Sequence, residues 1–296
     1  MQGISVWTQY LSRVLFLTLY ALDVYFAYLL TENENITAIT ALGLLLVLFI
    51  GSKVNLITLK AVPLRKCRSS DSERLIRCFD EVSHHGEQIG IRRRNVKLYI
   101  ADNDSVNAFT IGGCIVVNRG LIYLNDTGAL KAVIAHEYGH LINKDYWFSS
   151  LLRFNISAIL FLFLLGAAGS FFTIVIVFAI LMEFLGASLF PVLLISKLLK
   201  GMFNIIFRIY HFILNAFAAI LFRIQELEAD KLSIRLGYTN SMKALLEYVS
   251  RQSDNTHMTW TEIILNDHPS VYKRLARIEK IERQIEEAEN HQLRRI

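Results

Sequence analysis

The stretch VIAHEYGHLIN, residues 133–143, places two histidines four positions apart and a glutamate directly after the first histidine. On a helix, His136 and His140 lie one turn apart on the same face, where both imidazoles can bind one cation. Glu137 lies about 100° around the helix from His136, so it is placed to hold a water molecule beside the ion. This H-E-x-x-H pattern arises by chance in roughly one of ninety such chains, and it predicts two metal ligands and a general base.

A catalytic zinc site uses three protein ligands and keeps a fourth position open for water, so one more ligand is required. The stretch RIQELEADKLS, residues 223–233, offers Glu226 and Asp230 at positions i and i+4 of one helical face. One carboxylate can bind zinc while the other accepts a hydrogen bond from the second ring nitrogen of a ligand histidine. Glu228 points to the far side of this helix, about 200° away, and is predicted to be a solvated acid.

The order H-E-Y-G-H and then E-L-E-A-D resembles the HtpX-type integral-membrane zinc metalloproteases, which are gluzincins related to the CAAX prenyl proteases. In that family the third ligand is the first Glu of E-x-x-A-D, which falls on Glu226, and the Asp falls on Asp230. NAFTIGGCIVVNRGLI, residues 107–122, is similar to the family's N-A-F motif and the strand before its metal-binding helix. DHPSVYKRLARI is similar to its H-P motif, which falls on His268, Pro269 and Arg274. The resemblance spans nearly the whole chain.

The resemblance implies one Zn²⁺ per chain, with Asp230 behind a ligand histidine and with the ligands His136, His140 and Glu226. Zinc bound there would lower the pKa of a water molecule toward neutral. Glu137 would take the proton as water attacks a peptide carbonyl and then deliver it to the leaving amine. His268 and Arg274 are the candidates for stabilising the oxyanion, and a helix-packing or capping role is the alternative for both.

A substrate-binding edge strand is expected in the same region. An extended peptide that adds to the edge of a sheet is held by backbone hydrogen bonds, so many side chains are tolerated. The residues assigned to this edge strand are Cys114, Ile115, Val116, Val117 and Asn118.

Composition indicates a membrane protein with a polar part. Of the 296 residues, 53% are hydrophobic and 19% are charged, whereas ordinary domains are about a quarter charged. Two apolar blocks, residues 14–30 and 36–50, flank the acidic loop TENEN and predict a retained helical hairpin, not a removed signal peptide. Basic residues gather just after the second block, which places residues 51 onward in the cytoplasm: Lys53, Lys60, Arg65, Lys66 and Arg68.

The membrane topology is constrained by the metal site. If His140 and Glu226 bind one ion, the chain between them crosses the membrane an even number of times. One route uses spans at 154–180 and 202–222; the other folds the apolar block 156–196 as a hairpin and leaves 202–222 at the interface. The positive-inside rule favours the second route, and the family habit of running a span into the ligand helix favours the first. Both routes give four spans and a cytoplasmic site.

The polar segment after residue 50 predicts helices and short strands. Strands are expected over 96–101 and 114–124. A helix over 127–144, capped by Asp126 or Thr127, carries the H-E-x-x-H motif. A helix over 72–91 is predicted with one apolar side formed by Leu75, Ile76, Phe79 and Val82.

The predicted fold class is mainly α with a small β-sheet (α+β), a zincin-type metalloprotease domain with four transmembrane helices in two hairpins. Residues 1–50 form the first hairpin, and 51–150 form the first half of the protease domain. Residues 151–222 form an inserted hairpin, and 223–296 complete the protease domain with the third ligand and C-terminal helices.

The implied function is that of a membrane-embedded zinc endopeptidase for membrane or misfolded proteins, acting in protein quality control and the stress response. The expected location is a bacterial-type inner membrane, with lipid and protein or peptide substrates as partners. A dedicated processing protease and a non-catalytic zinc-binding scaffold are the alternatives, although a structural zinc usually has a fourth ligand, commonly Cys. A transporter is disfavoured because the spans contain only Asp23 and Glu183 as acids. No nucleic-acid-binding pattern accompanies the basic clusters.

Overall fold

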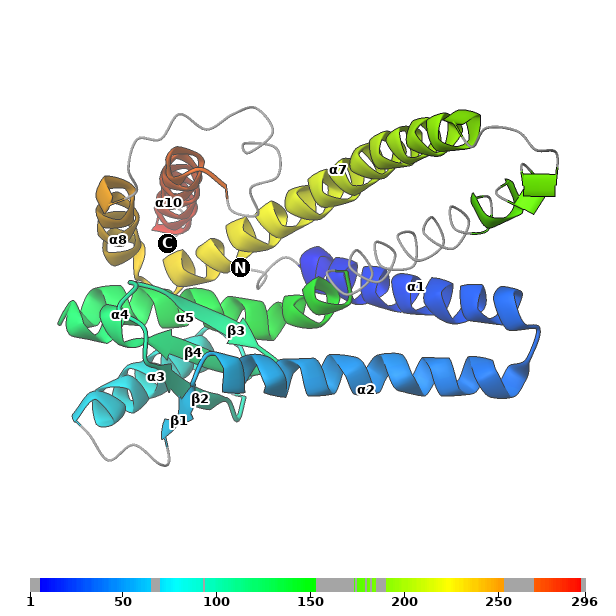
Figure 1. Cartoon of the computed structure of the whole chain (residues 1–296). Helices are drawn as coiled ribbons and strands as arrows, with labels where there is room; N and C mark the ends of the chain where they lie inside the picture. The colour runs from blue at the N-terminus through cyan, green and yellow to red at the C-terminus, as the bar shows by residue number, and fades with distance from the viewer. Residues whose placement is uncertain are drawn as a thin grey trace. The chain divides into compact units, whose positions relative to one another are not determined.

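The computed structural model describes residues 6–64, 70–92, 94–152, 173, 175–178, 180–181, 183–184, 190–252 and 269–293. These residues are mainly helical and include one small mixed sheet, so the predicted α+β class is confirmed (Figure 1). The chain divides into two compact units, which are described separately. The first comprises Met1–Leu151, Leu221–Met258 and Asp267–Ile296, and the second comprises Leu152–Ile220 and Thr259–Asn266.

The helices of the described chain range from five to 46 residues. They are α1 (Val6–Thr31), α2 (Glu34–Thr58), α3 (Ser70–Gln88), α4 (Arg119–Tyr123), α5 (Thr127–Asn143), α7 (Phe190–Arg235), α8 (Thr239–Gln252) and α10 (Val271–Leu293). The hairpin predicted within 156–196, with its turn near 166–170, lies largely outside the described residues. Residues 202–222 belong to the continuous helix α7, which runs on into the segment that carries Glu226.

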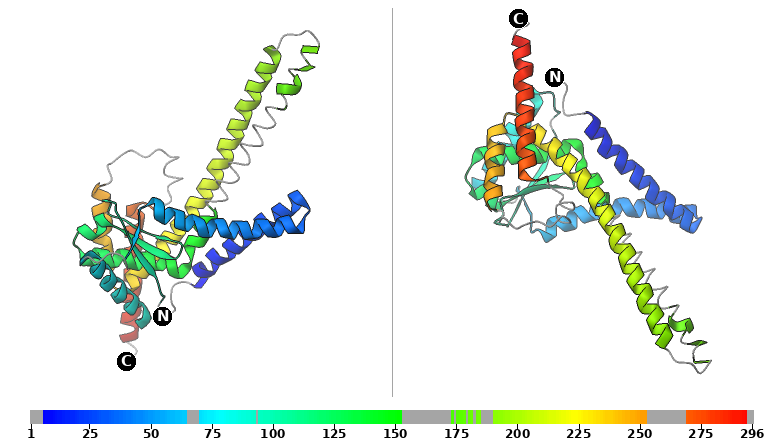
Figure 2. Two further views of the ribbon diagram at one scale, coloured as in Figure 1. Left: turned by 60° about the horizontal axis from the view of Figure 1, so that its bottom comes forward. Right: turned by 90° about the horizontal axis from the view of Figure 1, so that it is seen from above.

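Helices α1 and α2 form an antiparallel hairpin at the N-terminus, with α1 in dark blue (Figures 1 and 2). Asn33 ends the short loop by capping α2, where its side chain accepts hydrogen bonds from the backbone N–H groups of Asn35 (2.9 Å) and Ile36 (3.2 Å). The hydroxyl of Tyr20 donates to the carbonyl of Ala41 at 2.9 Å and ties the two helices together. Both helices extend beyond the predicted apolar blocks.

Two helical stretches are long and apolar enough to cross a membrane among the residues that the structure describes. They are Glu34–Thr58 and Asn204–Arg235, and α1 contributes the shorter apolar stretch Phe16–Leu29. About 20 mostly apolar residues span a bilayer core, so both long stretches meet that requirement.

The four-stranded sheet has the order β1-β2-β4-β3, with strands β1 (Val62–Pro63), β2 (Lys97–Ala101), β3 (Ala108–Ile111) and β4 (Cys114–Asn118). β2 and β4 are parallel, and the other two pairs are antiparallel. The predicted strand at 96–101 is confirmed as β2. The prediction of a strand over 114–124 is wrong in its second half, because residues 119–123 form α4. The loop after β2 closes over the end of β4 there, with the N–H of Gly120 bonded to the carbonyl of Asn103 at 3.0 Å.

The edge-strand assignment of Cys114, Ile115, Val116, Val117 and Asn118 is also wrong. β4 pairs with β2 on one side and with β3 on the other, and all five of its residues are buried. A strand buried on both faces reads as a continuous apolar run, and such a run is typical of a central strand. The free edge on this side of the sheet belongs to β3, which reaches β4 through a tight turn at Gly112 and Gly113. Both glycines have positive φ (54° and 82°), as a two-residue hairpin turn requires.

Helices α3 and α5 pack together beside the sheet to form the main core of the first unit. On α3, Leu75, Phe79 and Val82 are buried as predicted, but Ile76 is 44% exposed. The ring of Phe79 meets that of Tyr138 on α5 edge to face, with 5.8 Å between the centroids. Helices α8 and α10 complete the unit, with α8 packed on both α5 and α10 (Figure 2). Helix α5 is therefore enclosed by neighbours on several sides.

Candidate metal centre

Helix α5 begins and ends at residues whose local chemistry fixes its limits. The side chain of Asp126 accepts a hydrogen bond from the N–H of Ala129 at 3.0 Å, so it is the N-cap, as one of the two predicted options. The helix ends where Lys144 adopts a left-handed conformation (φ 61°). The predicted helix over 127–144 is thus confirmed, and it buries His136 and Glu137 within the fold.

A glycine allows α5 to approach α7 closely. A Cβ atom added at Gly139 would lie 3.0 Å from the Cα of Ala229 and 3.3 Å from its Cβ. Because glycine and alanine face each other at this point, the helix backbones approach closely beside the two histidines. Glu226, one turn before Ala229 on α7, can therefore reach both imidazoles.

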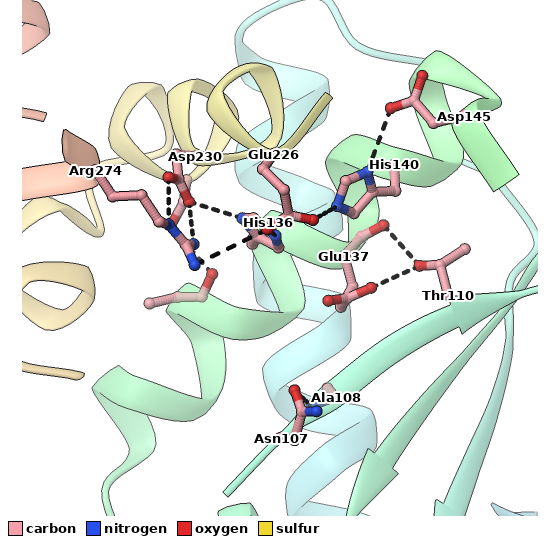
Figure 3. Close-up of polar contacts among 12 residues, drawn as sticks. Asn107, Ala108, Thr110, His136, Glu137, His140, Asp145, Glu226, Asp230 and Arg274 are labelled. Carbon is pink, nitrogen blue, oxygen red and sulfur yellow. Dashed lines mark hydrogen bonds and ion pairs between the residues drawn. The ribbon is translucent and has the colours of Figure 1, made fainter. Parts of the chain in front are cut away.

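The structure brings His136, His140 and Glu226 together (Figure 3). One ligand atom from each residue lies within 4.8 Å of the other two. The Nε2 atoms of His136 and His140 are 3.5 and 3.3 Å from the carboxylate oxygens of Glu226. A tetrahedral ion with bonds of about 2.0–2.1 Å separates its donor atoms by roughly 3.3–3.5 Å, so both histidine-to-glutamate separations match those of a zinc site.

Each histidine of this group has a carboxylate against its other ring nitrogen. Nδ1 of His136 is 2.8 Å from Asp230, and Nδ1 of His140 is 3.3 Å from Asp145. An Nδ1–H that donates to a carboxylate fixes the tautomer and leaves the Nε2 lone pair free for a metal. Asp230 occupies the position that the sequence predicted. Asp145 was missed, although it directly follows the left-handed residue that ends α5 and is only 3% exposed.

The electrostatics of the group favour positive charge. Burial opposes the protonated imidazole of His136, but hydrogen bonds and charge from Asp230 and Glu226 outweigh it and raise its pKa to about 9. Burial likewise opposes protonation of His140, and Asp145 and Glu226 nevertheless hold its pKa well above the usual value. Burial acts to raise the pKa of the Asp230 carboxyl. Hydrogen bonds and positive charge from His136 and Arg274 outweigh burial and hold this pKa below its usual value. The carboxylates thus create a negative potential suited to a divalent cation.

Arg274, on α10, engages the carboxylates behind the histidines. Its Nε and Nη2 atoms donate to Asp230 at 2.8 and 2.5 Å, and its Nη1 lies 3.9 Å from Glu226. A paired contact of this kind fixes the orientation of Asp230. The guanidinium is therefore engaged in holding the carboxylate that orients His136. His268, the other oxyanion candidate, lies outside the described residues.

Glu137 is 6% exposed, and its carboxylate is held from strand β3. The hydroxyl of Thr110 lies 2.8 Å from Oε2 of Glu137 and 3.1 Å from the backbone carbonyl of the same residue (Figure 3). The sequence did not single out Thr110, because the contact depends on the register of β3 against α5. Asn107, the first residue of the N-A-F motif, shapes the turn before β3 by accepting a hydrogen bond from the N–H of Ala108 at 2.9 Å.

The prediction that Glu228 is a solvated acid is wrong. Its side chain is 12% exposed, and its carboxylate lies 3.6 Å from the ammonium group of Lys231. Glu228 would be solvated only if this helix had one side open to solvent. In this part of α7, residues 221–233 are buried or half-buried with the exception of Ile224, so both sides of the helix are covered.

Comparison with known proteins shows the family to which the chain belongs. A model of peptidase family M48 matches residues 69–282, a range that contains all three clustered residues. The chain belongs to peptidase family M48. Peptidases of this family are zinc metalloproteases, so this M48 peptidase is a metalloprotease.

The relatives of this M48 peptidase carry the names that the sequence motifs suggested. Protease HtpX of Shewanella oneidensis is 25% identical over 229 residues, which cover 68% of this chain and 72% of that protein. A protease HtpX homolog of Halobacterium salinarum is 29% identical over 120 residues, covering 38% of this chain and 39% of that one. The crystal structure of S. mikatae Ste24p aligns with a TM-score of 0.50 and 18% identity, covering 89% of this chain. The chain spans 62% of the length of that structure, and this likeness concerns the fold alone.

Proposed function

We propose that this M48 peptidase is a zinc-dependent endopeptidase with the ligands His136, His140 and Glu226 and the general base Glu137. The observation that carries the proposal is the clustering of those three ligand atoms beside a buried glutamate. A closed structural site would favour a fourth ligand, commonly Cys. Neither Cys78 nor Cys114 belongs to the cluster found among the described residues, which favours the enzyme over a non-catalytic scaffold.

The chain's own groups account for the steps of peptide hydrolysis. Zinc, when bound, supplies a Lewis acid and lowers the pKa of a water molecule. Glu137 takes the proton from the attacking water and passes it to the leaving amine. Asp230 and Asp145 hold the two imidazoles in the tautomer that presents Nε2. Arg274 acts through Asp230, and His268 remains the proposed partner of the oxyanion.

Strand β3 replaces β4 as the proposed substrate-binding edge. An extended substrate can hydrogen-bond along the side of β3 that does not face β4. Thr110 on that strand contacts Glu137, so a substrate on β3 is held close to the proposed base. Backbone pairing tolerates many side chains, which suits a quality-control protease of membrane or misfolded proteins better than a dedicated processing enzyme.

The proposed membrane arrangement has four spans, in hairpins over residues 1–50 and 151–222 that flank the first half of the protease domain. Two spans have candidates in α2 and α7, and α1 contains a shorter apolar stretch. Glu226 lies beside His140, so an α7 span requires a second crossing between these residues. The continuity of α7 into its ligand segment supports the route with a span at 202–222. The basic residues after α2 support a cytoplasmic site at a bacterial-type inner membrane.

The proposed activity is tested with the full-length chain purified in detergent and incubated with casein. We expect new peptide termini by mass spectrometry, no cleavage after treatment with 1,10-phenanthroline, and recovery when zinc is restored. Fragments at many unrelated sites would support broad specificity, and a single site would support dedicated processing. Intact casein under zinc-replete conditions, or cleavage that survives chelation, would contradict the proposal.

The topology is tested with single cysteines in a Cys67→Ser background, because the described cysteines, Cys78 and Cys114, are buried. An impermeant maleimide added to intact spheroplasts should label Glu32→Cys in the loop between α1 and α2. Asp102→Cys, in the protease domain, should be labelled only after the membrane is permeabilised. Asp102 is an informative position because its side chain is 67% exposed. The reverse pattern of labelling would place the active site outside the cytoplasm.

A further inference from the structure

Strand β3 presents one hydroxyl to the residue that the proposed function uses as its base. Thr110 and Ala108 share a face of β3, since alternate residues of a strand point the same way, and this face packs against α5. On that face, the Thr110 hydroxyl lies within hydrogen-bonding distance of both the side chain and the backbone of Glu137. Within the described residues, no other side chain donates a hydrogen bond to the Glu137 carboxylate.

The single proton of the Thr110 hydroxyl faces two acceptors of Glu137, the carboxylate at 2.8 Å and the backbone carbonyl at 3.1 Å. The Glu137 carbonyl belongs to α5 and is fixed by the helix, so the 3.1 Å contact places the hydroxyl relative to the helix itself. The 2.8 Å contact then places the carboxylate oxygen relative to the same hydroxyl. Threonine is suited to this position because its branched Cβ restricts χ1 and aims the hydroxyl along one direction. A glutamate side chain has three rotatable bonds, and a hydrogen bond to its carboxylate restricts them.

Strand β3 is itself held at both ends, so Thr110 has a fixed position. Before the strand, the carbonyl of Asn107 accepts a hydrogen bond from the N–H of Asn118 at 3.0 Å. After the strand, the turn at Gly112 rests on α2. A Cβ atom added at Gly112 would lie 2.6 Å from the Cβ of Ser52 and 2.7 Å from its Oγ. The hairpin tip thus contacts the first membrane-spanning candidate directly.

We infer that Thr110 is a positioning residue for the reaction: its hydroxyl holds the Glu137 carboxylate in the orientation in which it accepts the proton from the attacking water. The inference rests on the proposed function. Thr110 is given a role in turnover and none in metal binding, because both acceptors that its hydroxyl faces belong to Glu137, which is not one of the three proposed ligand residues. The same strand, β3, then pairs with the substrate and also orients the base.

The test is Thr110→Val, which removes the hydroxyl and keeps the branched shape, in the zinc-loaded full-length chain. The expected result is a fall in kcat of about 10- to 100-fold, the size of a hydrogen bond to a charged group, with KM within about threefold of wild type. Zinc stoichiometry and thermal unfolding should match those of wild type. Thr110→Ser restores the hydroxyl and should recover most of kcat. Thr58→Val is the matched control, because it removes a hydroxyl bonded to the Val54 carbonyl of α2 and should leave kcat unchanged.

The outcomes separate the inference from the function on which it rests. If wild type cleaves casein and Thr110→Val retains its kcat, the positioning role is wrong and the peptidase stands. A loss of kcat in Thr110→Ser equal to that of Thr110→Val would show that the methyl group, and not the hydroxyl, matters. Loss of zinc or of thermal stability in both variants would make the role structural and overturn the inference. Failure of wild type to cleave would instead contradict the proposed function.

Discussion

Glu137→Gln is expected to lower kcat for casein cleavage by about 10²- to 10⁴-fold, the contribution of a general base. Glutamine keeps the size of the side chain and can accept the hydrogen bond from Thr110, but it cannot take a proton from water. The three ligand residues are untouched, so zinc stoichiometry measured by atomic emission should stay at one per chain. Initial rates from a fluorogenic casein assay, together with KM, measure the effect. KM should change little because Glu137 is proposed to act on water.

Unchanged cleavage by Glu137→Gln would contradict the role proposed for Glu137. If Glu137→Gln cleaved at the wild-type rate with zinc present, the base would have to be another group, and the role given to Thr110 would fall with it. Glu137→Asp is a useful companion, since it keeps the carboxylate and withdraws it by one methylene. An intermediate rate for this variant would show that placement of the carboxylate matters as well as its chemistry.

Glu226→Ala is expected to lose both zinc and activity, while Glu228→Ala keeps both. Removing an outer partner of a metal ligand typically costs 10- to 100-fold in affinity, and removing one of three ligands should cost about that much or more. The pair is well matched, because the two side chains lie on the same helix and are 13% and 12% exposed. Each substitution removes one carboxylate, so the two variants change the net charge by the same amount. Zinc content after dialysis against a weak chelator is the measurement.

The comparison also distinguishes folding from binding. Glu228 pairs with Lys231 in a nearly enclosed position, so Glu228→Ala has its own stability cost, which thermal unfolding in the presence of zinc would record. A Glu228→Ala protein that folds and retains zinc isolates the effect of Glu226. Zinc retention by Glu226→Ala, with loss in Glu228→Ala, would move the third ligand to the other side of α7.

The sequence predicted those parts of the site that depend on local periodicity. His136 and His140 share a helical face, and Glu226 and Asp230 share another, because residues four apart on a helix always do. A capping residue at Asp126 follows from the same short-range chemistry. These placements need no knowledge of how distant segments meet. The spacing left open which of Glu226 and Asp230 binds the ion, and the resemblance to a family assigned that role to Glu226; the structure brings the same residues together.

The parts that were missed or wrong depend on contacts between distant segments. Strand β4 is central because it pairs with both β2 and β3. Its apolar run alone does not show which strands lie beside it. Thr110 meets Glu137 only because the Gly112–Gly113 turn sets the register of β3. The burial of Glu228 depends on what covers the second side of α7. Asp145 is a partial exception, since an acid just beyond a helix whose last turns carry both histidines is a pattern that the sequence shows.

The order of the ligands along the chain has a consequence for biosynthesis. Two of the proposed ligands precede the inserted apolar segment, and the third, Glu226, follows it. A ribosome that has translated the first half has made the two histidines and the proposed base, but the nascent chain cannot yet complete a three-ligand site. The third ligand is synthesised only after the apolar insertion, on a helix that must then dock at Gly139. The proposed three-ligand site can therefore be completed only after the insertion has been synthesised.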